Sequence, residues 1–323
     1  MIQAVVGIDT SCYLTSCALV DIDGRILADV RLKLNVPQGK RGLRQNEAVF
    51  QHVRHMPRIL RTVFSKVSQV RLNAVCASNQ PMHGTDSYMP VFTVGASFAS
   101  ALSESHRIHC FFTSHQQGHF AAAMSGQQEL REECLAVHLS GGTTQVLHLK
   151  NTEMTLLGNT LDISAGQLLD RLGVMMGYPF PSGASLEALA STASSQRRYP
   201  AIVKDGSVSF SGVEAAAIKD LQAKGLNNSQ IAVELFDVIA RSIKKMISDA
   251  SIRTDVRNVL ITGGVASSSL FRTLLVHRLE KCSAAIKPYF CLPEYAGDNA
   301  VGVALIGLEQ YRNQEGNQHG NHS

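Results

Sequence analysis

Two histidines four residues apart, His115 and His119, stand in the stretch "TSHQQGHFAAAM" at residues 113–124. On an α-helix, side chains at positions i and i+4 project from the same face, about one turn apart. Two imidazoles placed in this way can bind one metal ion. Ser114 is a suitable N-cap for such a helix, and Gly118 leaves the space beside the pair open. The spacing indicates a metal-binding helix; a pair of ordinary, hydrogen-bonded histidines remains the alternative.

The residue beside the first histidine argues against a metallopeptidase. That class carries a glutamate there as its general base, whereas position 116 is Gln, which cannot take up a proton in this way. A metal site also needs a third ligand, and Asp298 in "PEYAGDNAVG" is a candidate because it precedes the last helical pattern. A simple helix cap, by Asp298 or Asn299, is the alternative interpretation.

Three small polar turns follow apolar strands, and such turns can bind phosphate through their backbone N–H groups. A Gly-Gly turn is common and weakly specific by itself, but three such turns in this order are more informative. Their sequences are "DTSCYLTS" at 9–16, "LSGGTTQ" at 139–145 and "TGGVASSS" at 262–269.

The elements that must position these residues follow an alternating pattern. Apolar runs predict strands around residues 4–8, 18–20 and 26–30, a helix over about 45–68, and a strand over 108–114 that leads into the histidine pair. The layout restarts at "ECLAVHLSGGTTQVLHLK". Two similar halves predict an α/β fold with two mixed sheets that face a shared cleft.

The halves give a predicted domain division. Residues 1–112 together with 296–312 form the first lobe, residues 113–295 form the second, and the polar residues 313–323 are expected to be a disordered tail.

Composition sets the broad class. The chain has 323 residues, of which 45% are hydrophobic and 17% charged, with a net charge of +4, which suits a globular protein and is compatible with an RNA partner. The seven cysteines contain no CxxC spacing, so we expect reduced thiols in a cytoplasmic protein rather than a zinc ribbon. The apolar run of "MIQAVVGIDTSC" stops at Asp9 and predicts a first strand rather than a signal peptide. No run of about 18 apolar residues predicts a membrane span.

Seven motifs in order carry a resemblance to a known family. The chain resembles, over about residues 4–308, the transferases of tRNA threonylcarbamoyladenosine synthesis (TsaD-like, formerly called O-sialoglycoprotein endopeptidases). The resemblance implies the fold of actin-like ATPases and sugar kinases (ASKHA), with two duplicated RNase H-like domains. The motifs are "GIDTSC", "SHQQGHFAA", "LSGGTTQV", "LGNTLDISAGQLLDRLGVMMGYPFPSGASLEALA", "VSFSGVEAA", "ITGGVASSSLFR" and "GDNAVGVALIG".

The resemblance also implies an activity and its site. The family transfers the threonylcarbamoyl group from threonylcarbamoyl-AMP to N6 of adenosine 37 in tRNAs that read ANN codons. Its metal, Fe²⁺ or Zn²⁺, would be bound here by His115, His119 and Asp298. Its partners include a paralogous inactive subunit (TsaB-like) and a small ATPase (TsaE-like). The matching nucleotide-binding positions are His138, Leu139, Ser140, Gly141, Gly142, Asp170, Gly183 and Ser268.

Several positions depart from the family pattern and indicate a divergent paralogue. An acidic pair is replaced by Tyr13 and Leu14, a histidine by Thr143, and an asparagine by Ser268. A glycine-rich segment is replaced over residues 81–92. Gln167 takes the place of a glutamate, and Arg171 that of a lysine.

These departures keep other functions open. The chain could be a non-catalytic binding subunit, or a carbamoyltransferase or kinase acting on another substrate; in a kinase, Asp9 could hold magnesium. No residue is assigned as catalytic. His83 and His138 are candidate proton carriers, with an ordinary core or surface histidine as the alternative.

A basic segment over residues 38–61 is a candidate tRNA contact, and a solvated helical face explains it equally well. Its basic residues are Lys40, Arg41, Arg44, Arg54, Arg58 and Arg61.

Overall fold

The protein divides into two compact units in a computed structural model. The first unit comprises Met1–Ser125 and Gly297–Ser323, and the second comprises Gly126–Ala296. The structure describes residues 1–11, 13–36, 43–82, 88–130, 132–150, 153–223, 225–282, 285–295, 297 and 299–320.

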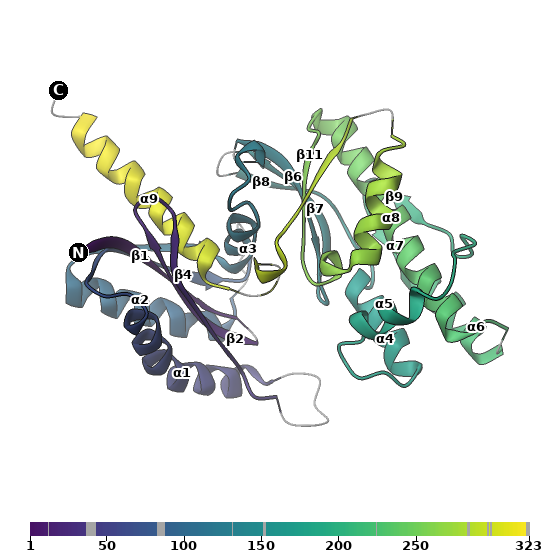
Figure 1. Ribbon diagram of the computed structural model, residues 1–323, viewed down its shortest axis with the longest axis horizontal. Helices are drawn as coiled ribbons and strands as arrows, with labels where there is room; N and C mark the ends of the chain where they lie inside the picture. Colours follow the sequence, from purple (N-terminus) through teal and green to yellow (C-terminus); the bar gives the residue numbers. More distant parts are fainter. Residues whose placement is uncertain are drawn as a thin grey trace. The chain divides into compact units, whose positions relative to one another are not determined.

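The sheet of the first unit has five strands in the order β3-β2-β1-β4-β5 (Figure 1). β1 pairs antiparallel with β2 and β2 with β3, whereas β1, β4 and β5 run parallel. The carboxyl ends of the three parallel strands therefore meet at one edge. The strands are β1 Ile2–Thr10, β2 Leu14–Asp21, β3 Ile26–Lys33, β4 Val70–Gln80 and β5 His109–Ser114.

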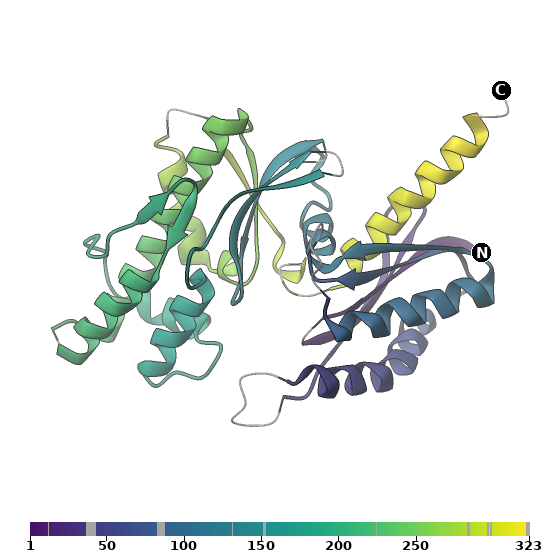
Figure 2. The ribbon, with the colours of Figure 1, turned by 180° about the vertical axis from the view of Figure 1, so that it is seen from behind.

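Both faces of this sheet are covered. The helices α1 and α2 pack on one face and α9 on the other (Figures 1 and 2). Val6 and Ile8 of β1 share a hydrophobic cluster with Met56 and Ile59 of α1. This double cover explains why β1 is continuously apolar rather than alternating. The helices are α1 Gln45–Ser65, α2 Pro90–His106, α3 His115–Ala123 and α9 Val301–Gly320.

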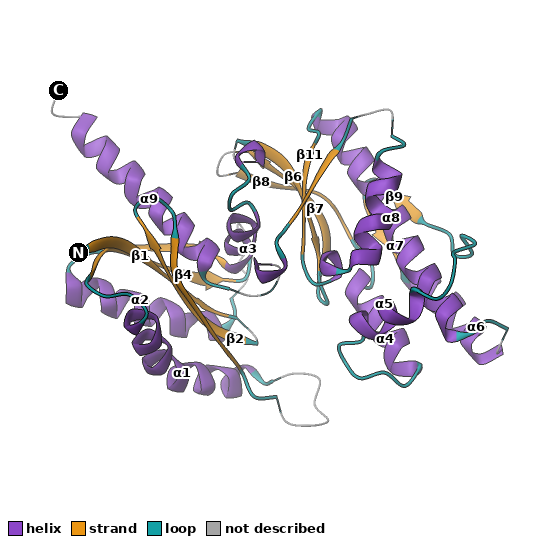
Figure 3. Ribbon diagram, viewed as in Figure 1, coloured by secondary structure: helices purple, strands orange, loops and turns teal. Residues whose placement is uncertain are grey.

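The second unit repeats the arrangement. Its sheet has the order β12-β11-β6-β7-β8, in which β6, β7 and β8 are antiparallel neighbours and β6, β11 and β12 are parallel (Figure 3). The predicted fold of actin-like ATPases and sugar kinases, with two mixed sheets, is confirmed. The strands are β6 Glu133–Leu139, β7 Thr144–Lys150, β8 Glu153–Asn159, β11 Asn258–Thr262 and β12 Lys287–Phe290, with a small hairpin of β9 Ile202–Lys204 and β10 Ser207–Ser209.

The long helix α7 forms the centre of the second core, because most of its residues from Ile231 to Ile247 are buried. Other helices of the unit pack around it. They are α4 Ala165–Met175, α5 Gly183–Ala190, α6 Ser211–Ala223, α7 Asn228–Thr254 and α8 Ser269–Leu279, with short 3₁₀ helices η1 Gln128–Leu130, η2 Val265–Ser267 and η3 Pro293–Tyr295. No described helix has both the length and the apolar character needed to cross a bilayer.

Two predicted boundaries need correction. The division between the units falls after Ser125 rather than after residue 112, because α3 packs closely on α9 of the first unit. The expected tail over 313–323 is helical as far as Gly320, because α9 continues beyond its packed part. Adding a turn to an existing helix is far easier than nucleating a new one.

Candidate functional site

The predicted histidine helix forms as α3, directly after β5. Ser114 caps it: its hydroxyl accepts from the Gln117 N–H at 3.2 Å, and the Gln117 side-chain oxygen accepts from the Ser114 N–H at 3.1 Å. This reciprocal pair is a capping box, which fixes where the helix begins. The predicted N-cap is confirmed.

The two imidazoles face each other from this helix. The Nε2 atoms of His115 and His119 lie 3.0 Å apart, and the ring centroids are separated by 4.4 Å. Two nitrogens bound at about 2.05 Å to one tetrahedral metal ion would be separated by about 3.3 Å. The pair therefore fits a shared divalent metal with only a small adjustment.

A carboxylate from another strand binds His115, and a hydroxyl from a third strand binds the same carboxylate oxygen. The His115 Nδ1 donates to Asp9 Oδ1 at 2.9 Å, and the Ser78 hydroxyl donates to the same oxygen. Asp9 is the last residue but one of β1 and Ser78 stands near the end of β4, so the parallel strands bring both to the edge where α3 begins. Neither contact was predicted, although the rule that parallel strands end at a common edge could have indicated it.

The third predicted metal ligand, Asp298, lies outside the described residues. Among those that the structure describes, no three His, Cys, Asp or Glu side chains form a group able to hold a metal ion. The residues that follow are informative: a Cβ on Gly302 of α9 would lie 1.8 Å from the backbone oxygen of Gly118. The first turn of α9 thus packs backbone to backbone on α3. The point of contact on α3 is Gly118, which stands between His115 and His119 in the sequence. Asn299, the alternative cap, accepts from the Val301 N–H at 3.0 Å.

The predicted nucleotide loop of the second unit connects β6 to β7. Its Ser140 hydroxyl accepts from the Thr143 N–H at 3.0 Å and contacts the Thr143 hydroxyl at 2.8 Å. Gly141 and Gly142 are exposed, and a Cβ on either would meet nothing within 4 Å. Both glycines therefore have open space beside Cα, although the Gly142 N–H already donates to the Ser140 hydroxyl at 3.3 Å and the Gly141 backbone packs against Gly166.

The starts of α4 and α8 lie at the same edge as this loop. The Ser164 hydroxyl, at the N-cap of α4, donates to the Gly141 carbonyl at 3.0 Å. A Cβ on Gly263, after β11, would lie 2.3 Å from the Leu139 carbonyl oxygen. Gly263 has a φ of +100°, so this close turn favours glycine. The next predicted contact, Ser268, uses its hydroxyl to accept from the Phe271 N–H at 3.1 Å and so caps α8.

Asp170 and Gly183, two further predicted nucleotide contacts, lie together. Asp170 Oδ1 accepts from the Ser182 N–H at 2.7 Å, at the start of α5. Burial raises the pKa of the Asp170 carboxyl, against the hydrogen bonds from the Ser182 and Gly183 backbone. Glu187 of the same helix joins α5 to α8, since its Oε1 accepts from the Leu270 N–H at 2.9 Å.

The substituted family positions have local structural roles. The Gln167 side-chain oxygen accepts from the Ser164 N–H at 3.2 Å, so this residue completes the capping box of α4 without a charge. Arg171 pairs with Glu214 of α6 at 3.3 Å. Tyr13 is more than half exposed, and its carbonyl accepts from the Leu34 N–H at 2.9 Å. His138 is half-buried at the end of β6, and His83 lies outside the described residues.

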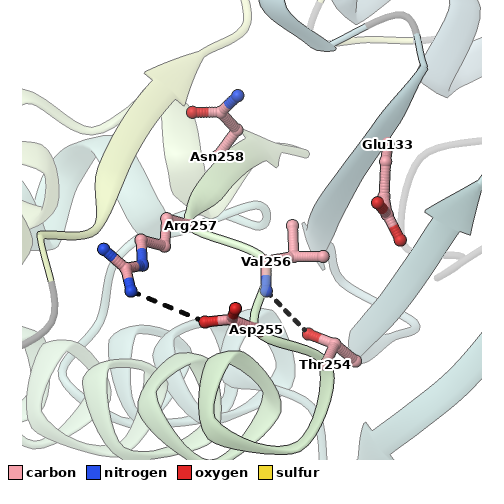
Figure 4. Close-up of a pocket in the computed structure, with 6 residues that line it drawn as sticks. All are labelled: Glu133, Thr254, Asp255, Val256, Arg257 and Asn258. Atoms are coloured by element: carbon pink, nitrogen blue, oxygen red, sulfur yellow. Dashed lines mark hydrogen bonds and ion pairs between the residues drawn. The ribbon is translucent and has the colours of Figure 1, made fainter.

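A shallow pocket lies at the opposite end of the second sheet (Figure 4). None of the predicted site residues lines it, and its Asp255 and Arg257 form an exposed ion pair at 3.5 Å. Glu133, at the start of β6, also lines this pocket. The hydrogen bond from His148 lowers the pKa of the Glu133 carboxyl. Its lining residues are Glu133, Thr254, Asp255, Val256, Arg257 and Asn258.

Comparisons with known proteins agree with this arrangement. The model of the tRNA N6-adenosine threonylcarbamoyltransferase family matches residues 26–305. A protein of that name from Chlamydia felis is 28% identical, with 97% of this chain and 93% of the relative covered. A probable bifunctional tRNA threonylcarbamoyladenosine biosynthesis protein from Methanocaldococcus jannaschii is 26% identical over 95% of this chain and 55% of its own length.

Solved structures share the fold at low identity. HypF from T. kodakarensis superposes with a TM-score of 0.66 at 13% identity, covering 97% of this chain and 48% of HypF. A ROK hexokinase from Thermus thermophilus superposes with a TM-score of 0.56 at 15% identity, covering 96% and 99% of the two chains.

Proposed function

Because the chain belongs to the tRNA N6-adenosine threonylcarbamoyltransferase family, a family of transferases that modify tRNA, we propose that it performs the full family reaction. It transfers the threonylcarbamoyl group from threonylcarbamoyl-AMP to N6 of adenosine 37 in tRNAs that read ANN codons. The observation that carries this proposal is the His115–His119 pair, whose Nε2 atoms lie 3.0 Å apart on a capped helix.

In this proposal, His115, His119 and Asp298 bind one divalent metal ion, Fe²⁺ or Zn²⁺. Two imidazoles and one carboxylate suit both ions. When bound, the ion would act as a Lewis acid and orient the substrate. The contact between Gly302 and Gly118 supports the role of Asp298, which is four residues from Gly302 in the chain.

The second unit binds the adenylate. The exposed Gly141–Gly142 turn receives the phosphate, and the backbone donors of such a turn stabilise the charge that develops as AMP leaves. The remaining contacts are His138, Leu139, Ser140, Asp170, Gly183 and Ser268. The amine of adenosine then forms a bond to the carbamoyl carbon while the bond from that carbon to the phosphate oxygen breaks, so that AMP leaves and N6 gives up one proton to solvent.

The tRNA contacts the basic face of α1. Arg54, Arg58 and Arg61 are exposed there, and the Arg54 guanidinium lies 5.8 Å from the centre of the Phe50 ring. Lys40 and Arg41 of the same segment lie outside the described residues. Such contacts to phosphates give salt-dependent affinity.

The partners are a TsaB-like inactive subunit and a TsaE-like small ATPase. We place the reaction in the cytoplasm, which agrees with the free thiols of all described cysteines.

The substituted positions favour a second candidate, a non-catalytic partner subunit. Tyr13 and Leu14, after β1, replace an acidic pair of the family, and Thr143, between β6 and β7, replaces a histidine. A kinase has less support, because Asp9, its candidate magnesium ligand, is completely buried and hydrogen-bonded to His115 and Ser78.

The test is a transfer reaction followed by nucleoside mass spectrometry. Purified chain, threonylcarbamoyl-AMP and unmodified tRNA are combined with and without the two partners, and metal content is measured in parallel. We expect N6-threonylcarbamoyladenosine with the wild type, and loss of both product and metal in His115→Ala and His119→Ala. His106→Ala, an exposed histidine on α2, is the matched control. Bound metal without product, even with both partners, would support the non-catalytic candidate instead.

A further inference from the structure

Asp9, next to the last residue of β1, is held by two hydrogen bonds. Its side chain is completely buried, and Oδ1 receives hydrogen bonds from His115 Nδ1 at 2.9 Å and from the Ser78 hydroxyl. Oδ2 is also buried and has no hydrogen-bond partner among the described residues. Leaving a buried carboxylate oxygen without a donor costs free energy, so this arrangement needs an explanation.

The contact selects the tautomer of His115. A carboxylate can only accept hydrogen bonds, so the ring proton of His115 must be on Nδ1. The lone pair is then on Nε2, which is the atom that faces His119 Nε2 at 3.0 Å. In the opposite tautomer the proton would be on Nε2, and His115 would have no lone pair there to bind a metal ion.

From these contacts we propose that Asp9 is the positioning residue of the metal centre: it orients His115 and fixes its tautomer so that Nε2 binds the ion. This inference rests on the proposed function, because it concerns the same metal. Asp9 cannot itself be a ligand of that ion, since it lies on the Nδ1 side of the ring. The carboxylate also makes the imidazole a stronger ligand.

Two substitutions separate the charge of Asp9 from its geometry. Asp9→Asn keeps an oxygen that can accept from His115 but loses the charge, whereas Asp9→Ala loses both. Loss of such a partner typically weakens metal affinity 10- to 100-fold. We expect about 10-fold for Asp9→Asn and about 100-fold for Asp9→Ala. Asp29→Asn is the control, because Asp29 is a half-buried carboxylate of the same sheet that pairs with Arg31 instead.

The measurement is Zn²⁺ affinity of the full chain by competition with a chromophoric chelator, with circular dichroism to show that each variant is folded. A second readout needs no metal: ¹⁵N chemical shifts of the histidine rings, assigned with His115→Ala, report the tautomer directly. We expect Nδ1–H for His115 in the metal-free wild type and a mixture of tautomers in Asp9→Asn.

The outcomes are distinguishable. Equal Zn²⁺ affinity in the wild type and Asp9→Asn, with loss in His115→Ala, would overturn the role of Asp9 and leave the metal centre intact. An Nε2–H tautomer in the wild type would overturn it as well, whatever the stability of the variants. Equal Zn²⁺ affinity in the wild type and His115→Ala would refute the metal centre itself, and the role of Asp9 with it.

Discussion

At the scale of single residues, Ser268 tests whether a family departure weakens nucleotide binding. Its hydroxyl caps α8, and asparagine is an equally good N-cap. We expect Ser268→Asn to leave the unfolding free energy within about 0.5 kcal/mol while its amide adds one ligand hydrogen bond. One such bond contributes about 0.5–1.5 kcal/mol, so AMP should bind about 2- to 10-fold more tightly by calorimetry.

The matched variant Ser268→Ala removes the cap and supplies no amide. It should lower the unfolding free energy by about 1 kcal/mol without improving AMP binding. If Ser268→Asn binds AMP no better than the wild type, this position does not contact the nucleotide.

A second residue-scale prediction concerns His52, a completely buried histidine under the turn that follows Asp9. Its Nε2 donates to the Ser11 carbonyl at 2.8 Å, so its Nδ1 must be the unprotonated atom, and it accepts from the Thr15 hydroxyl at 2.8 Å. Burial lowers the pKa of His52 from 6.5 to about 4. Protonation would place an unpaired charge in the core and remove the Thr15 hydrogen bond.

The sign of the pH dependence follows from this lowered pKa. Between pH 6.5 and about 4 the unfolded chain binds a proton that the folded chain does not, so stability falls as the pH falls through this window. From pH 7 to pH 5 the loss is about 2 kcal/mol. Urea unfolding at both pH values measures it. In His52→Gln the loss should be smaller by this amount, and an unchanged pH dependence would assign the effect to other groups.

At the scale of elements, the contact between α3 and α9 positions the metal helix. A Cβ on Gly302 would overlap the Gly118 carbonyl, so Gly302→Ala must push the two helices apart. Overpacking of this kind costs about 1–3 kcal/mol, and Zn²⁺ binding should weaken with it. Urea unfolding and Zn²⁺ titration are the measurements.

The same helix offers its own control. A Cβ on Gly316 would meet nothing within 4 Å, so Gly316→Ala should stabilise the protein by about 0.5–1 kcal/mol through helix propensity alone. Normal stability and Zn²⁺ binding in Gly302→Ala would show that close packing of α3 and α9 is dispensable.

The elements themselves were largely predictable, because local patterns determine them. The capping residue Ser114 and the apolar spacing of α1 are both visible in the sequence. The boundary of the first unit was not, since it depends on packing between α3 and a helix that begins more than 170 residues later in the chain. The helical end of α9 was missed for a related reason: residues after 312 have a polar pattern, and the packed first turns stabilise the helix.

At the scale of the whole molecule, the difference between local sequence patterns and packing of distant segments also explains which contacts near the site were predicted and which were missed. The histidine pair and the Gly141–Gly142 turn are local motifs, so sequence spacing was sufficient to predict the capped helix and the turn, whereas their binding roles stay predictions. The contact between Asp9 and His115 joins residues 106 positions apart, and no pattern within either segment specifies it. Only the parallel pairing of β1, β4 and β5 brings them together.

The two units give the last prediction, because the proposed metal ligands belong to the first and the nucleotide contacts to the second. A ligand stabilises the native segments that bind it, by about 2.7 kcal/mol at 100 times its dissociation constant. Local opening, and hence hydrogen exchange, should slow about 100-fold there. With Zn²⁺ we expect slower exchange in α3 and the start of α9, and with AMP in the loop at 139–143 and the starts of α5 and α8. His115→Ala should abolish the first effect and keep the second; protection of α3 by AMP, without protection of the loop, would contradict this assignment.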